Sequence, residues 1–154
     1  MISNSTLPYS DYLRGRKLDF FVNVFYNDAV FEDLFILFRK INISSWDWIY
    51  FLFNNYHEFE FKALVDDFIN ETENELSTKK KLVKLISQKK NIENFINGNL
   101  GNNLMFKYKS LSLTKFSNEM FLMVEKLTNN FLDKQNVSNS EIKKLTKEII
   151  LFNK

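Results

Sequence analysis

The fold is decided by residues 30–41, which read VFEDLFILFRKI. The apolar residues of this run recur at spacings of three and four, which place side chains on one face of an α-helix. The wide apolar face is formed by Val30, Phe31, Leu34, Phe35, Leu37, Phe38 and Ile41. So wide an apolar face has to be buried against other elements, and the run therefore predicts a helix that packs into a core.

Three further helices are predicted around this run. The first begins at Thr6-Leu7-Pro8, because proline is preorganised for the first helical position, and extends to about Tyr26. The next begins at Ser44-Ser45-Trp46-Asp47, where a serine hydroxyl accepts an early backbone N–H, and extends to about Tyr56. A fourth helical pattern covers residues 59–69.

The second half of the chain adds three predicted helices and a strand. A basic helix begins at Thr78, and an Asn/Gly loop covers residues 97–103. Residues 104–109 alternate apolar and polar side chains, which is compatible with a short strand, and residues 113–131 follow a helical pattern. A capping pattern at 138–141 begins the last helix, whose predicted apolar face carries Ile142, Leu145, Ile149 and Phe152.

These elements predict an all-α protein, a single compact bundle of six or seven helices with one short β segment near residues 104–109. The single proline and three glycines agree with this, because turn-rich β folds use many more of both. We expect residues 1–154 to form one domain, with a division into 1–97 and 104–154 left open at the Asn/Gly loop.

The composition argues against catalysis by this chain alone. It has no cysteine, one histidine and three glycines, whereas iron–sulfur and zinc–thiolate sites need cysteine and phosphate-binding loops need clustered glycines. Its bulk is aromatic instead, with 17 Phe, 6 Tyr and 2 Trp. We expect no catalytic residue, no metal site and no cofactor.

Cysteine content, hydropathy and net charge limit the cellular location and the classes of partner that we expect. The absence of cysteine fits a reducing cytoplasm, and no apolar run reaches the roughly 20 residues of a membrane span. The net charge of +2 is too small to indicate a nucleic-acid partner by itself. We therefore expect a cytoplasmic protein without a membrane partner, and the oligomeric state stays open.

His57 is the one side chain whose ordinary pKa lies near neutrality, so it is the default general acid or base. It follows an aromatic helix, where a histidine can simply hydrogen-bond the last carbonyl groups and favour the negative end of the dipole. No serine, cysteine or aspartate pattern marks it as the partner of a nucleophile. The structural role is favoured over catalysis.

Two charged stretches are weighed in the same way. The acids Asp66, Asp67, Glu71, Glu73 and Glu75 lack the turn glycine of a calcium loop, so a solvated surface is the favoured reading. The lysines of the basic helix offer a face for phosphate groups, yet apolar residues that need the core lie between them. These lysines are Lys79, Lys80, Lys81, Lys84, Lys89 and Lys90. A nucleic-acid partner is not favoured.

Trp46 and Trp48 are candidates for stacking on a planar ligand or for lining a pocket. Because they are two residues apart on a predicted helix, they point about 200° away from each other and do not easily share one pocket. Most of the aromatic side chains must form the core, although so many leave room for an exposed patch that a partner covers.

The N-terminal stretch 9–28 places Arg14, Arg16 and Lys17 in a predicted helix, with Gly15 between the two arginines. Because glycine inside a helix costs about 1 kcal/mol relative to alanine, we expect close packing at Gly15. The tyrosine–aspartate, basic and Val-x-x-Phe-Tyr-Asn elements of this stretch are followed by Ser45-Trp46-Asp47-Trp48. Together, over about residues 8–56, they resemble the helical C-terminal region of cobalamin-binding radical S-adenosylmethionine proteins.

The resemblance implies a non-catalytic accessory domain that packs on or caps a catalytic barrel absent from this chain. The Cys-x3-Cys-x2-Cys motif and the cobalamin domain of that family do not occur here, so no catalytic residue carries over. Arg14, Arg16 and Lys17 are then candidates for docking or for binding an anionic group. The alternative is a stand-alone all-helical protein-interaction module, for example from a mobile element.

Overall fold

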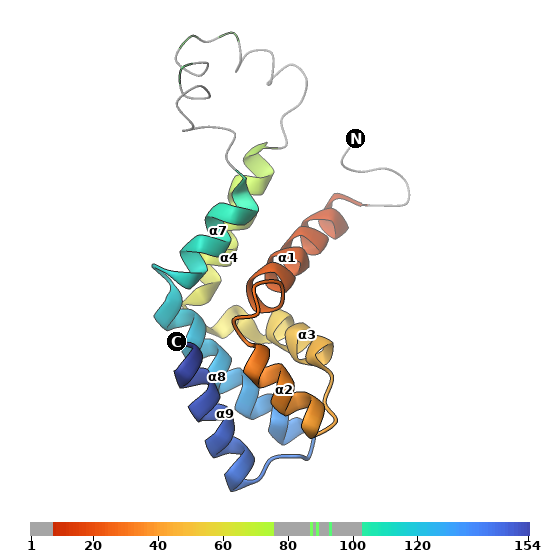
Figure 1. Cartoon of the computed structure of the whole chain (residues 1–154). Helices are drawn as coiled ribbons and strands as arrows, with labels where there is room; N and C mark the ends of the chain where they lie inside the picture. Colours follow the sequence, from red (N-terminus) through yellow and green to blue (C-terminus); the bar gives the residue numbers. More distant parts are fainter. Residues whose placement is uncertain (1–7, 76–86, 88, 90–92, 94–102) are drawn as a thin grey trace.

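The computed structural model describes residues 8–75, 87, 89, 93 and 103–154. These residues form an all-α bundle (Figure 1), as the sequence predicts. Its helices are α1 (Tyr9–Phe25), α2 (Glu32–Lys40), α3 (Ser45–Asn55), the short 3-10 helix η1 (Tyr56–Glu58), α4 (Phe61–Glu75), α7 (Leu104–Leu113), α8 (Ser117–Lys134) and α9 (Ser140–Asn153). Among the described helices, none combines the length and the apolar character that crossing a membrane requires.

Side-chain caps fix where three of these helices begin. The Ser44 hydroxyl accepts a hydrogen bond from the backbone N–H of Asp47 at 3.2 Å, and Asn139 accepts one from that of Ile142 at 2.8 Å. Each cap satisfies one of the backbone N–H groups that the first turn leaves unpaired. The predicted caps at Ser44 and within 138–141 are therefore confirmed, and Asn103 caps α7 in the same manner.

The core is built around Trp48 of α3, which is fully buried. Four phenylalanine rings surround its indole with centroids 5.6–6.2 Å away, at the edge-to-face angles that aromatic pairs prefer. They are Phe25, Phe31, Phe35 and Phe38. The apolar face of residues 30–41 is thus the wall that closes on Trp48.

Both halves of the chain contribute to this one cluster of buried side chains. The indole N–H of Trp48 donates to the Thr128 hydroxyl of α8 at 3.0 Å, across 80 residues of sequence. Helix α8 packs against α3, α7 and α9, while α2 packs against α9. Figure 1 shows α2 and α9 side by side at the lower end of the bundle.

The predicted strand at residues 104–109 is wrong, because these residues lie in helix α7. The buried residues of α7 are Leu104, Tyr108 and Ser112, a spacing of four that suits a helix packed against α1 and α4. Phe106, which the alternation would have placed beside Leu104 and Tyr108, is 65% exposed. A lone strand would have left its backbone N–H and C=O groups without partners.

Other predicted elements lie outside the described residues. The basic helix falls there with Lys79, Lys80, Lys81, Lys84 and Lys90, and so does most of the Asn/Gly loop. The close packing expected at Gly15 is wrong within the described part of the chain: no atom of it outside the local helix backbone lies within 4 Å of a Cβ built there.

Candidate functional site

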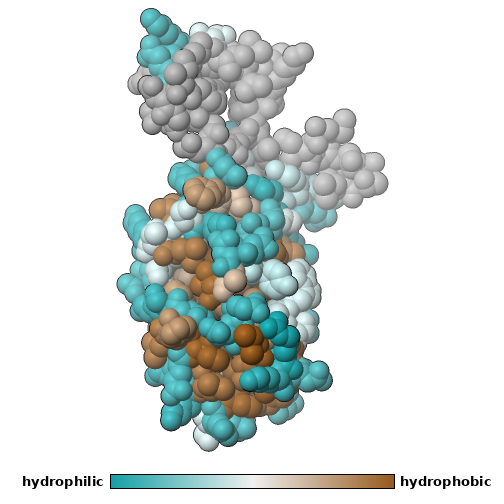
Figure 2. Space-filling model, in the orientation of Figure 1, coloured by the Kyte–Doolittle hydropathy of each residue, from teal (hydrophilic) through white to brown (hydrophobic). Residues whose placement is uncertain are grey.

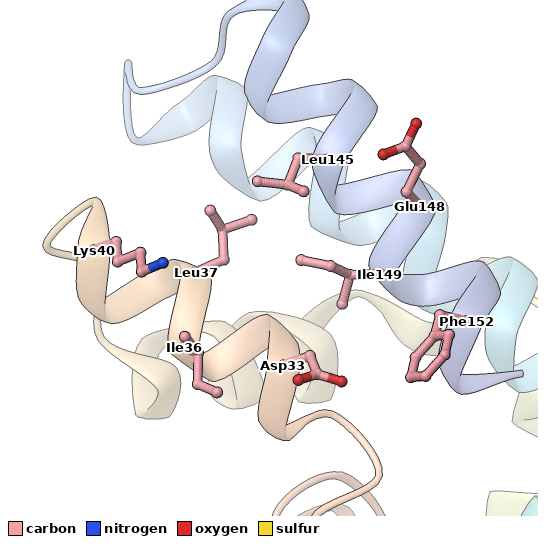
Figure 3. Close-up of a pocket in the computed structure, with 8 residues that line it drawn as sticks. All are labelled: Asp33, Ile36, Leu37, Lys40, Leu145, Glu148, Ile149 and Phe152. Carbon is pink, nitrogen blue, oxygen red and sulfur yellow. The ribbon is translucent and has the colours of Figure 1, made fainter.

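An open apolar groove runs between α2 and α9, with a volume of about 540 Å³. Figure 3 shows the side chains of the two helices approaching each other across it. Its walls are Asp33, Ile36, Leu37 and Lys40 of α2, and Leu145, Glu148, Ile149 and Phe152 of α9. In the view of Figure 2, hydrophobic surface gathers over the lower part of the molecule, where Figure 1 places these helices.

Helix α2 exposes part of its apolar surface because it is apolar on more than one side. Its inner face buries Leu34, Phe35, Leu37 and Phe38. Ile36 stands in the same run of apolar residues and cannot share that face, so it remains 39% exposed. Leu37 lies at the floor of the groove and Ile36 on its rim.

Helix α9 exposes even more. Its buried residues are Thr146 and Ile150, which face the bundle. Of the predicted apolar face of this helix, Ile142 and Ile149 are partly buried against the core, whereas Leu145 is 42% exposed and Phe152 is 83% exposed in the groove beside α2. Exposed apolar surface that collects on one face of a protein is typical of an interaction site.

The two charged residues of the α2 wall stand at opposite ends of the groove. Asp33 and Lys40 are seven residues apart on α2, which places them on one face about 10 Å apart. Within the described part of the chain neither of them forms an ion pair, whereas Glu148 lies 3.9 Å from Lys144. The groove therefore has one acidic end and one basic end, with apolar side chains between them.

The basic residues predicted to bind an anion are each engaged within the chain. Arg14 donates to the Tyr50 hydroxyl at 3.0 Å and lies over the ring of Phe53. Arg16 pairs with Asp19 at 3.2 Å, and the Lys17 ammonium lies 5.8 Å from the centroid of the Tyr56 ring.

Trp46 and Trp48 separate as the helical spacing predicts. Trp48 is buried in the core, whereas Trp46 is 52% exposed and stacks on Tyr50 with ring centroids 6.3 Å apart. Arg14, through Tyr50, is thus connected to Trp46 on the surface of α1 and α3. The predicted site residues do not converge on one centre.

His57 lies in η1, exposed, with its ring tilted by 38° against the Tyr56 ring at a centroid distance of 4.0 Å. It borders a second hollow of about 400 Å³, which is lined by Phe51, Asn54, Asn55, His57, Glu58, Phe59, Leu127, Asn130, Asp133 and Lys134. The described lining offers no serine, threonine or cysteine that a histidine could activate as a nucleophile.

Metal binding has no support in the described part of the chain, where no group of three His, Cys, Asp or Glu side chains could hold an ion. One of the acids that the sequence placed in a solvated cluster, Glu71, accepts hydrogen bonds from the Lys107 ammonium at 2.6 and 2.9 Å and from the Tyr108 hydroxyl at 2.8 Å. These contacts join α4 to α7, a structural role.

Sequence reasoning missed the α2–α9 groove as a site, although it assigned Leu37, Leu145, Ile149 and Phe152 to apolar helix faces. The signal was the unbroken apolar run from Leu34 to Phe38, which no single helical face can bury. The sequence also predicted the apolar face of α9. It does not show which part of that face the neighbouring helices cover.

Comparisons with known protein families, with characterised proteins and with solved structures find no match to this chain.

Proposed function

We propose that this protein is a helical protein-interaction module that binds an apolar helix of a partner in the groove between α2 and α9. One observation carries the proposal: both walls present exposed apolar side chains that no described residue covers. The exposed ones are Leu145 and Phe152 on α9 and Ile36 on α2, while the buried Leu37 and the partly buried Ile149 line the groove between them. A spacing of three and four is how one helix packs along another.

A small-molecule site is a weaker reading of the same groove. Such sites enclose most of their ligand and orient it with a few convergent polar groups. Here the polar side chains are Asp33, Lys40 and Glu148, and all three are exposed. A long apolar floor with charged side chains along its exposed rim suits a helix better, because a helix offers its own polar residues beyond its apolar stripe.

The proposal is tested by selecting short amphipathic helices from a displayed library on the intact chain. Leu145→Asp and Phe152→Asp should each weaken the selected helices about tenfold or more, because a buried carboxylate replaces an apolar anchor. Leu122→Asp is the matched control: Leu122 is 52% exposed on α8 and does not line the groove.

Circular dichroism of each variant separates loss of binding from loss of folding. Selected helices that bind Phe152→Asp as tightly as the unaltered chain would place the binding surface elsewhere and contradict the proposal. The same holds if Leu122→Asp abolishes binding as completely as the two groove substitutions.

The accessory-domain role is a special form of this proposal, in which the partner is a catalytic barrel. The resemblance to radical S-adenosylmethionine proteins covers residues 8–56 and thus includes α2, one wall of the groove. Its test is the coding sequence upstream, which should contain a Cys-x3-Cys-x2-Cys motif. In either form we propose that the chain acts by binding and catalyses no reaction alone.

A further inference from the structure

We propose that the occupant of the α2–α9 groove is the same groove of a second copy of this chain, so that the protein forms a two-fold symmetric dimer. This inference rests on the proposed function, because it names the partner of that site. It follows from the way the charges and the apolar side chains are distributed along the groove.

The charges of the groove are self-complementary. Asp33 and Lys40 stand at opposite ends of α2, and neither has an ion-pair partner within the described ranges. A two-fold axis across the groove makes the two α2 helices antiparallel and brings Lys40 of each copy to Asp33 of the other. This one rotation therefore forms two ion pairs between the copies, each joining Asp33 of one copy to Lys40 of the other.

The apolar side chains match under the same rotation. The two α9 helices also become antiparallel, so Leu145 of one copy faces Phe152 of the other. Ile36 and Ile149, which lie midway along the groove in Figure 3, come close to the axis. The most exposed apolar side chains of the groove are thereby buried between four helices, the arrangement of an antiparallel helix bundle.

One residue opposes this dimer. Glu148 also lies midway along the groove, so the two copies of Glu148 approach each other near the axis. Lys144, 3.9 Å from Glu148, offsets this repulsion only in part because both side chains are well exposed. Removing the charge with Glu148→Gln should therefore tighten the dimer, an effect that a merely adhesive apolar surface does not produce.

The experiment is sedimentation equilibrium of the full chain over a range of protein concentrations and at two salt concentrations. We expect a monomer–dimer equilibrium for the unaltered chain. Asp33→Lys and Lys40→Asp should each raise the dissociation constant by about tenfold or more, because each places two like-charged contacts in the interface. The double variant restores opposite charges and should return to within about threefold of the original value.

Three controls make the outcome decisive. Phe152→Asp should be monomeric, Glu148→Gln should dimerise more tightly, and Leu122→Asp on α8 should dimerise like the unaltered chain. Circular dichroism reports whether each variant is folded. A dimer that survives Phe152→Asp, or charge reversals that fail to rescue each other, would overturn the inference.

The failure of this inference is distinguishable from the failure of the proposed function. If the chain stays monomeric while selected helices bind in the groove, the occupant is another protein and the dimer is wrong. If it stays monomeric and no selected helix depends on Leu145 or Phe152, both proposals fail.

Discussion

A buried hydrogen bond joins Trp48, at the centre of the aromatic core, to helix α8 in the second half of the chain. The Trp48 indole donates to the Thr128 hydroxyl, and both side chains are completely buried. Leaving a buried polar group unpaired costs free energy, so this hydrogen bond constrains how α3 packs against α8. Trp46, two residues earlier on the same helix, forms no such hydrogen bond with the residues that the structure describes and is half exposed.

Trp48→Phe should lower the free energy of unfolding by roughly 2–4 kcal/mol, because it leaves a cavity and strands the Thr128 hydroxyl. Trp46→Phe is the matched control and should change the stability little, since its ring is 52% exposed. Urea denaturation followed by circular dichroism measures both. Equal losses in the two variants would mean that the buried bond contributes nothing.

At Gly15 we expect a substitution to stabilise the protein. It lies within α1, exposed, and a Cβ placed there meets no described neighbouring atom within 4 Å. Gly15→Ala should therefore stabilise the protein by about 0.5–1 kcal/mol, because alanine loses less backbone entropy in a helix. A thermal melt that shows destabilisation would instead indicate that something packs closely against this position.

At the scale of helices, the contact between α4 and α7 depends on one carboxylate. Burial alone would raise the pKa of Glu71, but the hydrogen bonds from Lys107 and Tyr108 outweigh it, and the pKa lies below the usual 4.5. Burial and the bond to Glu71 raise the pKa of Tyr108. The pair is thus stable when Glu71 is ionised and Tyr108 is neutral.

The sign of the pH dependence follows from these directions. Since the pKa of Glu71 is lower in the folded state, its contribution is complete above the usual value of 4.5 and is lost as the pH falls below it. The contribution of Tyr108 is complete below its usual value of 10.0 and is lost as the pH rises further.

Glu71→Gln should flatten the acid side of the stability–pH curve. The expected change is small, about 0.5 kcal/mol or less, because the Glu71 side chain is 40% exposed and water screens the pair. Glu60→Gln, at an exposed acid without a described ion pair, should leave the curve unchanged. An acid limb as steep in Glu71→Gln as in the unaltered chain would contradict this role.

The elements also show where sequence reasoning succeeds. Periodicity identified residues 30–41 and the caps at Ser44 and 138–141 because these signals are local: a helical stripe and a side chain three residues from the N–H it binds. The strand prediction at residues 104–109 was wrong because Leu104 and Tyr108, which alternation places on one side of a strand, are four residues apart and therefore also share one face of a helix.

For the whole molecule, the sequence predicted the class of fold but not the surface. The helices can bury their phenylalanines only against one another, and this gives a helical bundle irrespective of which helices are neighbours. Which apolar side chains remain outside depends on contacts between distant segments, such as α2 with α9. Leu145 and Phe152 therefore could not be told apart from core residues before their neighbours were known.

The two tryptophans of α3 give the chain a built-in pair of optical probes. Trp46 is open to an aqueous quencher such as iodide, whereas Trp48 is shielded from it. Trp48 touches Phe35 and Phe38, and these rings belong to the helix that forms one wall of the groove. The fluorescence that remains in the presence of iodide thus comes from Trp48, in the interior beside α2. Changes in this emission report on the α2 wall of the groove without any added dye.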